Sequence, residues 1–267
     1  MFEGCRRPGL LQDVVVRKVS GNPDLARRFV VAALGGATVS VSGGLLALAA
    51  ASASTRLPRE VAGIRLPDSP LALAASNLAR AASPAFLFNH CMRTFLFGAL
   101  LAERDRVPYD QEMIFIAAGL HDLGLTRTYA SAAQPFEVDG ADAAKAFLVS
   151  RGVSEARAEL VWNAIALHTS ILVEHQPPQV GLVGDGAGAD VFGSQLDTLA
   201  EERVRTIVRA FPRLSFNTEF RDLLVAHCQR KPFAQRGTWL DGFCRLHNPA
   251  VQYPDLESRL LSTRVGD

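Results

Sequence analysis

Residues 111–124 read QEMIFIAAGLHDLG, and this stretch decides the fold. It is almost wholly apolar until its last turn, which is typical of a helix buried on all sides. The apolar run then meets two polar residues, His121 and Asp122, and Gly124 suits the left-handed residue that ends a helix. The stretch therefore predicts a buried helix that closes on a histidine and an aspartate.

Two other segments also place a histidine in apolar surroundings. His90 lies in a strongly apolar run, and we expect Ser83 and Pro84 to open its helix as cap and first residue. A second helix is predicted from Ser154, and its apolar stripe continues directly into His168. Both imidazoles are thus expected to face the core of the protein.

Asp190 follows the glycine-rich stretch 181–188 and leads back into apolar sequence. The stretch has no lysine and carries Asp185, so it matches neither a nucleotide-binding P-loop nor a dinucleotide fingerprint. We interpret it as a flexible turn beside Asp190.

These histidines and aspartates together predict one metal site. A lone histidine on an apolar face is usually a hydrogen-bonded core residue, but an aspartate is seldom buried without a cation or a metal. Arg127 is the only lysine or arginine within about a helical turn of Asp122 or Asp190. We therefore expect one divalent ion, zinc, with iron or manganese as alternatives, and an open position for reactive water. That combination predicts hydrolysis or hydration.

In their order along the chain these segments resemble the HD superfamily of metal-dependent phosphohydrolases and related enzymes, from about Ser83 to Asp197. The resemblance is closer to the cyanamide hydratase branch, where Thr126-Arg127 departs from the consecutive threonines of the fungal members. Five segments carry it: FNH at 88–90, HDLGLT at 121–126, FEVDGA at 136–141, AIALHT at 164–169 and DVFG at 190–193.

The resemblance implies a role for each site residue. His90, His121, Asp122 and Asp190 would hold the metal, and Asp122 could also orient the water. His168 would line the site and carry protons, since an ordinary histidine pKa of about 6.5 allows it to accept and to donate a proton near neutrality. In this interpretation activated water attacks the carbon of a small nitrile such as cyanamide, and an amide or urea results.

Three alternatives stay open at this point. Arg93 and Arg127 keep an HD phosphohydrolase as the second interpretation, because phosphate esters need cationic partners. An oxygenase-like di-iron member of the superfamily would need further histidines, and only His175 could begin to supply them. A binding module with a structural metal is disfavoured, because an inert relative could lose any ligand without penalty.

Composition agrees with one compact enzyme domain, and the resemblance implies that its substrate is a small molecule. The chain has 267 residues, of which 48% are hydrophobic and 21% charged, so it can bury a large core. A net charge of +1 argues against a nucleic-acid partner, and an oligomer is left open. The four cysteines show no CxxC or zinc-ribbon spacing, and no disulfide framework is expected.

Residues 1–55 differ from the rest of the chain. A basic start precedes an uncharged run over 29–55, and Ala51-Ser52-Ala53 lies near the end of that run. This pattern resembles an export signal and predicts an exported or periplasmic protein, with a cytoplasmic one as the alternative. A retained membrane anchor or a small-residue helix packed on the domain are the other interpretations, and a membrane is a partner only if the run is retained.

The remaining chain divides into a lead-in and a catalytic part. Residues 56–82 are predicted to be a polar linker up to Asp68, followed by a helix over 71–82 that Ser69 and Pro70 cap. Residues 83–267 form the catalytic domain, with later helices expected over 196–210, 217–230 and within 239–261. No strand pattern of useful length and no repeat is found. We expect an all-α fold, a single HD-domain helical bundle around the metal site.

Overall fold

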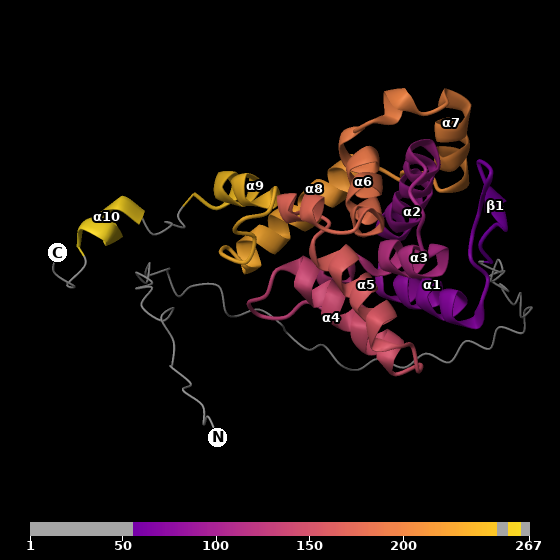
Figure 1. Cartoon of the computed structure of the whole chain (residues 1–267). Helices are drawn as coiled ribbons and strands as arrows, with labels where there is room; N and C mark the ends of the chain where they lie inside the picture. Colours follow the sequence, from indigo (N-terminus) through magenta and orange to yellow (C-terminus); the bar gives the residue numbers. More distant parts are fainter. Residues whose placement is uncertain (1–55, 250–255, 263–267) are drawn as a thin grey trace, which may run out of the picture. The chain divides into compact units, whose positions relative to one another are not determined.

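The computed structural model describes residues 56–249 and 256–262, and nearly all regular structure within them is helical (Figure 1). The strands β1 (Glu60–Val61) and β2 (Ile64–Arg65) form one short antiparallel pair. The predicted all-α fold is confirmed. The helices are α1 (Pro70–Ala82), α2 (Ala85–Asp105), α3 (Gln111–Leu120), η1 (Leu123–Leu125), α4 (Phe136–Val149), α5 (Glu155–Ala166), η2 (Ile171–His175), α6 (Pro178–Phe192), η3 (Leu196–Thr198), α7 (Glu201–Ala210), α8 (Phe216–Arg230), α9 (Leu240–His247) and α10 (Leu256–Leu261).

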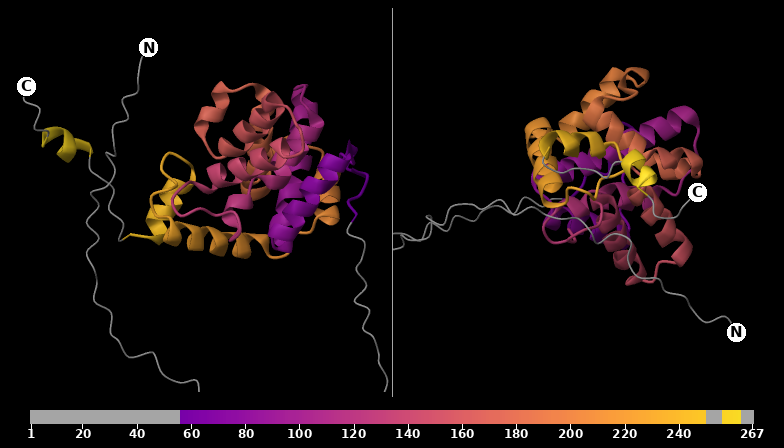
Figure 2. Two further views of the ribbon diagram at one scale, coloured as in Figure 1. Left: turned by 90° about the horizontal axis from the view of Figure 1, so that it is seen from below. Right: turned by 90° about the vertical axis from the view of Figure 1, so that its left-hand side faces the viewer.

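The α2 helix forms the centre of the fold and packs along α6, α3 and α8 (Figure 1). It is long and apolar enough to cross a membrane by length and composition, but 83% of that apolar window is buried inside the protein. It is therefore the core helix of the bundle. Both views of Figure 2 show α8 and α9, in yellow-orange, close together.

The glycine-rich stretch is helical, so the flexible turn predicted over 181–188 is wrong. These residues lie inside α6, and the glycines allow α6 to approach its neighbours closely. A Cβ at Gly186 would lie 2.0 Å from the carbonyl oxygen of Thr94, and one at Gly184 would lie 2.8 Å from the carbonyl oxygen of His168. Tertiary packing therefore outweighs the low helix propensity of glycine.

The predicted role of Gly124 is also corrected. α3 ends at Leu120, and Gly124 lies in η1 rather than in a left-handed cap. A Cβ at Gly124 would lie 2.0 Å from the carbonyl oxygen of Phe136, so glycine is needed for close contact with the start of α4. This contact fixes the turn that carries His121 and Asp122.

The stretch 56–68 is a packed hairpin rather than the predicted polar linker. Val61, Ile64 and Leu66 are buried in the main core, because the β1–β2 pair turns these apolar side chains inward. The cap that follows is as predicted, since the Ser69 hydroxyl accepts the backbone N–H of Ala72.

Other helix boundaries differ from expectation by a few residues. α2 begins after Pro84, which occupies the cap position itself, so Ser83 does not cap it. The helix expected over 196–210 is divided into η3 and α7, and the one expected over 217–230 is α8. His168 lies just beyond the end of α5.

A disulfide joins Cys228 of α8 to Cys244 of α9, contrary to the expectation of none. Both cysteines are buried in a second apolar cluster that includes Phe136, Phe216 and Phe220. The spacing of 16 residues carries no recognisable motif, and the two sulfurs meet because α9 packs against α8. Cys91 is buried as a free thiol in α2.

Candidate metal centre

Three of the four predicted ligands meet at the centre of the bundle. His90 comes from α2, and His121 and Asp122 come from the turn between α3 and η1. One ligand atom from each lies within 4.8 Å of the others, and all three side chains are buried. The closed turn after α3 thus delivers two ligands to the face of α2 that carries the third.

Asp122 supplies the strongest sign that a cation belongs here. Its Oδ2 lies 3.6 Å from His90 Nε2 and 3.4 Å from His121 Nε2, and it has no hydrogen-bond partner among the described residues. A buried polar atom without a partner costs roughly 1–3 kcal/mol, and more when it is charged. A divalent ion between these three atoms would remove that cost, so the residues present fit the expected metal.

The other nitrogen of each imidazole is already engaged. His90 Nδ1 donates to Asp190 Oδ2 over 2.7 Å, and His121 Nδ1 donates to the carbonyl oxygen of Ala118 over 2.8 Å. Each histidine therefore keeps its Nε2 free as an electron-pair donor. Metal-binding histidines are commonly oriented by this type of hydrogen bond.

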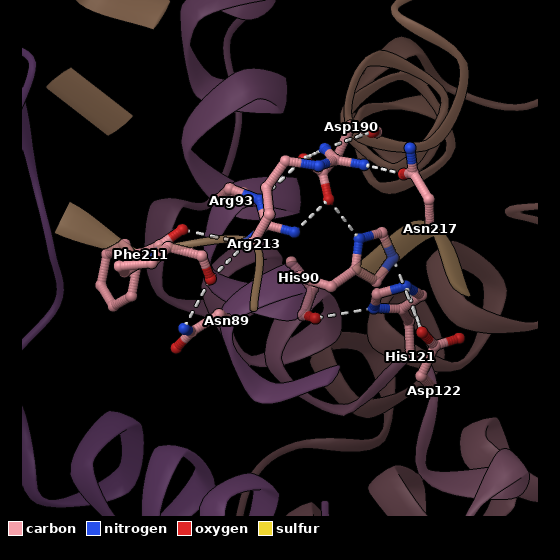
Figure 3. A network of polar contacts seen from close by, with 11 residues as sticks. Asn89, His90, Arg93, His121, Asp122, Asp190, Phe211, Arg213 and Asn217 are labelled. Carbon is pink, nitrogen blue, oxygen red and sulfur yellow. Dashed lines mark hydrogen bonds and ion pairs between the residues drawn. The ribbon is translucent and has the colours of Figure 1, made fainter. Parts of the chain in front are cut away.

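Asp190 lies behind His90 and not within the group of three (Figure 3). Arg93 binds it with two hydrogen bonds of 2.7 Å, and Arg213 adds one of 2.9 Å. Burial alone would raise the pKa of Asp190, but the hydrogen bonds from His90 and Arg93 hold it well below its usual range. The geometry therefore favours a supporting role for Asp190 over the predicted role as a direct ligand.

His168 lies beside the three ligand residues, in contact with the ring of His121. Its ring is 4.9 Å from that of His121, centroid to centroid, and its Nδ1 donates to the carbonyl oxygen of Ile165 over 2.6 Å. Its Nε2 is therefore left for a proton or a substrate. Burial, together with repulsion by a neighbouring imidazole, lowers the pKa of both His121 and His168 to about 3.

A small cavity of about 110 Å³ opens beside the three ligands. Pockets for drug-sized ligands usually measure roughly 300–1,000 Å³, so this one suits a molecule of a few non-hydrogen atoms. No lysine or arginine is among the described residues that line it, which are His90, His121, Asp122, Phe136, His168, Gly184, Ala187, Gly188, Val191, Phe192, Phe220 and Trp239.

Sequence reasoning did not single out the contribution of the C-terminal segment. Phe220 of α8 and Trp239 before α9 line the cavity, although they follow the last segment of the recognised motif. A buried network fixes this segment: Gln235 donates to Glu137, and the Thr169 hydroxyl donates to the other oxygen of Glu137 over 2.6 Å. No local pattern in the sequence signals these contacts.

The remaining histidines lie apart from the ligand group. His175, the residue that could have begun a second ion site, is exposed at the end of η2. His227 is buried in the network around Gln235, and His247 contacts Phe243 on α9. Within the described residues the structure therefore offers His175 no part in a second metal site.

Comparison with known proteins agrees with this site. Residues 87–215 match the family model of the HD domain. The chain is also 26% identical over 194 residues to two proteins of Saccharomyces cerevisiae, cyanamide hydratase DDI2 and cyanamide hydratase DDI3, which covers 70% of this chain and 86% of each relative. These matches support a metal-dependent enzyme of the HD superfamily. Residues 87–215 are thus similar to the HD domain, and the chain is similar to the yeast cyanamide hydratases over most of its length.

Proposed function

We propose that this protein is a hydratase that adds water to a small nitrile of the cyanamide type and yields an amide or urea. The observation that carries the proposal is the cavity beside His90, His121 and Asp122. It is small, largely apolar, and free of lysine and arginine among its described lining residues. The similarity to the yeast cyanamide hydratases supports the same reaction.

The two arginines that favoured a phosphohydrolase do not line this cavity. Arg93 is fully buried, and its guanidinium donates hydrogen bonds to Asp190 and to the carbonyl oxygens of Phe211 and Pro212. Arg127 lines a separate cavity with Arg230 and Lys231. A phosphate ester in the metal cavity would therefore lack the cationic partners that usually bind phosphate.

The three ligand residues define what the protein contributes to the ion. His90 Nε2, His121 Nε2 and Asp122 Oδ2 would hold it, and Asp190 and the carbonyl oxygen of Ala118 orient the two imidazoles. A bound divalent ion lowers the pKa of water from about 15.7 towards 7 and so supplies a nucleophile at neutral pH.

His168 is placed to move the protons of the reaction. Hydration forms a carbon–oxygen bond as one π bond of the nitrile breaks, and one proton of the water passes to the nitrile nitrogen. The second proton reaches that nitrogen when the imidic acid tautomerises to the amide or urea. His168 Nε2 is the free nitrogen of a ring that lines the cavity, and the lowered pKa of His168 leaves this nitrogen unprotonated at neutral pH, ready to accept the first proton and return it to the nitrile nitrogen. The apolar walls, which include Phe136 and Phe220, exclude other water from the site.

Turnover of two probes tests the proposal directly. The full chain, loaded with zinc, is assayed for urea formation from cyanamide and for phosphate release from p-nitrophenyl phosphate. We expect urea formation in the wild type and none in Asp122→Ala, which should also lose the metal. Asp222→Ala, which removes an exposed carboxylate on α8, serves as the matched control and should behave as the wild type. Phosphate release without urea formation would overturn the proposal.

A further inference from the structure

Two aromatic side chains stand at the mouth of the metal cavity. Phe192 and Trp239 both line it, yet they are 63% and 40% exposed, so each reaches from the cavity to solvent. Their rings meet edge to face, with centroids 5.2 Å apart and planes at 88°. This is a favoured arrangement for an aromatic pair, worth about 0.5–1.5 kcal/mol beyond the area it buries.

The backbone that carries Trp239 is held firmly in place. Its N–H donates to the carbonyl oxygen of Thr169, directly after His168 in sequence. Four residues earlier, Gln235 is fully buried and donates to Glu137 and contacts His227. The Cys228–Cys244 disulfide brackets the segment, so the indole is attached to a fixed support although its face is exposed.

Phe192 is fixed from the opposite side. It ends α6, and Gly193 with φ of +75° turns the chain away after it. Asp190, two residues earlier, is bound by Arg93 and Arg213. The two rings therefore approach each other from independently anchored elements.

We propose that Phe192 and Trp239 form an aromatic gate that sets the size limit of the substrate. The gate admits linear molecules of a few non-hydrogen atoms, such as cyanamide, and rejects aryl and branched nitriles. The nitrile identity of the substrate rests on the proposed function, but the size limit applies to any ligand that enters the cavity. Phe192 lies inside the region that matches the HD domain and Trp239 lies outside it, so the C-terminal segment supplies one of the two rings of the gate.

Activity measurements provide the first test. Trp239→Ala and Phe192→Ala are compared with the wild type on cyanamide and benzonitrile, with metal content measured alongside. We expect each variant to raise kcat/KM for benzonitrile relative to cyanamide by roughly tenfold or more, because removing ring volume relieves exclusion from an apolar pocket. Leu246→Ala removes an exposed apolar side chain from α9 that does not line the cavity, and should leave the ratio unchanged.

A binding measurement separates the gate from the reaction. The chain has two tryptophans, Trp162 and Trp239, so Trp162→Phe leaves Trp239 as the only indole emitter. In that background, imidazole and 4-phenylimidazole are titrated into the zinc-loaded protein and the emission of Trp239 is followed. We expect imidazole to change the emission, and Phe192→Ala to tighten binding of 4-phenylimidazole by roughly tenfold relative to imidazole.

The outcomes distinguish the two proposals. If no nitrile is hydrated but Phe192→Ala still tightens 4-phenylimidazole binding selectively, the gate stands and the proposed reaction fails. If cyanamide is hydrated but the size preference is the same in all variants, the gate is overturned and the reaction stands. If neither imidazole nor 4-phenylimidazole changes the emission of Trp239, the gate is also overturned.

Discussion

Asp190 is engaged by three side chains at once, and this determines what its loss should do. It accepts hydrogen bonds from His90, Arg93 and Arg213, while the ligand group consists of His90, His121 and Asp122. We expect Asp190→Asn to weaken metal affinity by roughly 10–100-fold without abolishing binding, as is usual for a residue that orients a ligand.

Zinc affinity measured by competition with a chelator checks this expectation. Asp122→Asn replaces the carboxylate of the ligand group itself and should show no measurable zinc binding. Equal loss of metal in both variants would make Asp190 a direct ligand, as the family resemblance implies.

Glu137 predicts a pH dependence of stability. Burial raises its pKa from 4.5 to about 7, although Thr169 and Gln235 donate to the carboxylate. Because the folded pKa is the higher one, its stabilising contribution is complete below pH 4.5 and is lost as the pH rises through 7. Between pH 4.5 and pH 8 the free energy of unfolding of the wild type should fall by on the order of 3 kcal/mol relative to that of Glu137→Gln, whose side chain cannot ionise.

Urea denaturation of both proteins at pH 5 and pH 8 measures this difference. Subtracting the two curves removes the contributions of the other titrating groups. Glu174→Gln, a change at an exposed glutamate on η2, is the control and should give no such difference. A wild type and a Glu137→Gln variant that differ equally at both pH values would contradict the prediction.

The ligand residues could be predicted from sequence because each combines a polar side chain with a buried setting. The apolar run before His121 and the stripe leading to His168 are local patterns that periodicity detects. Trp239 has no such signal, and Glu137 lies in the segment FEVDGA at 136–141 without a pattern that assigns it a role. Their part in the site depends on contacts between distant segments, such as Gln235 with Glu137, which one sequence does not reveal.

At the scale of elements, the disulfide between α8 and α9 should stabilise the C-terminal segment. It closes a loop of 16 residues, and the chain-entropy model gives about 3 kcal/mol for a loop of this size. We expect Cys228→Ala/Cys244→Ala to lower the free energy of unfolding by about this amount. Thermal unfolding is measured for the wild type and the double variant, each with and without a reductant. The reductant should lower the Tm of the wild type and leave that of the variant unchanged. A wild-type Tm that does not respond to the reductant would contradict the prediction.

The helices show where sequence patterns suffice and where packing decides. α3 and α8 follow from apolar periodicity and from proline stops, and both lie close to the predicted positions. α6 does not, because its glycines lower helix propensity while they permit contact with Thr94 and His168. The hairpin at 60–65 is too short to give a detectable alternation of polar and apolar residues.

At the scale of the whole molecule, we propose that the protein is exported. The basic start and the uncharged run lie within residues 1–55, outside the described residues, and the Cys228–Cys244 disulfide is typical of oxidising compartments. Protein isolated from its native host should therefore begin close to Ser54. Mass spectrometry of the native protein decides this, and an intact N-terminus in a cytosolic fraction would rule the signal out.

The central claim is that the buried ligand group and His168 together hydrate a small nitrile, and His168→Ala tests it most directly. Urea formation from cyanamide and zinc content per chain are measured on the same samples of wild type and variant. The variant should keep about one zinc ion per chain and lose roughly 10²–10⁴-fold in kcat, the usual worth of a positioned acid or base. A His168→Ala protein that keeps its zinc and forms urea at the wild-type rate would contradict the claim.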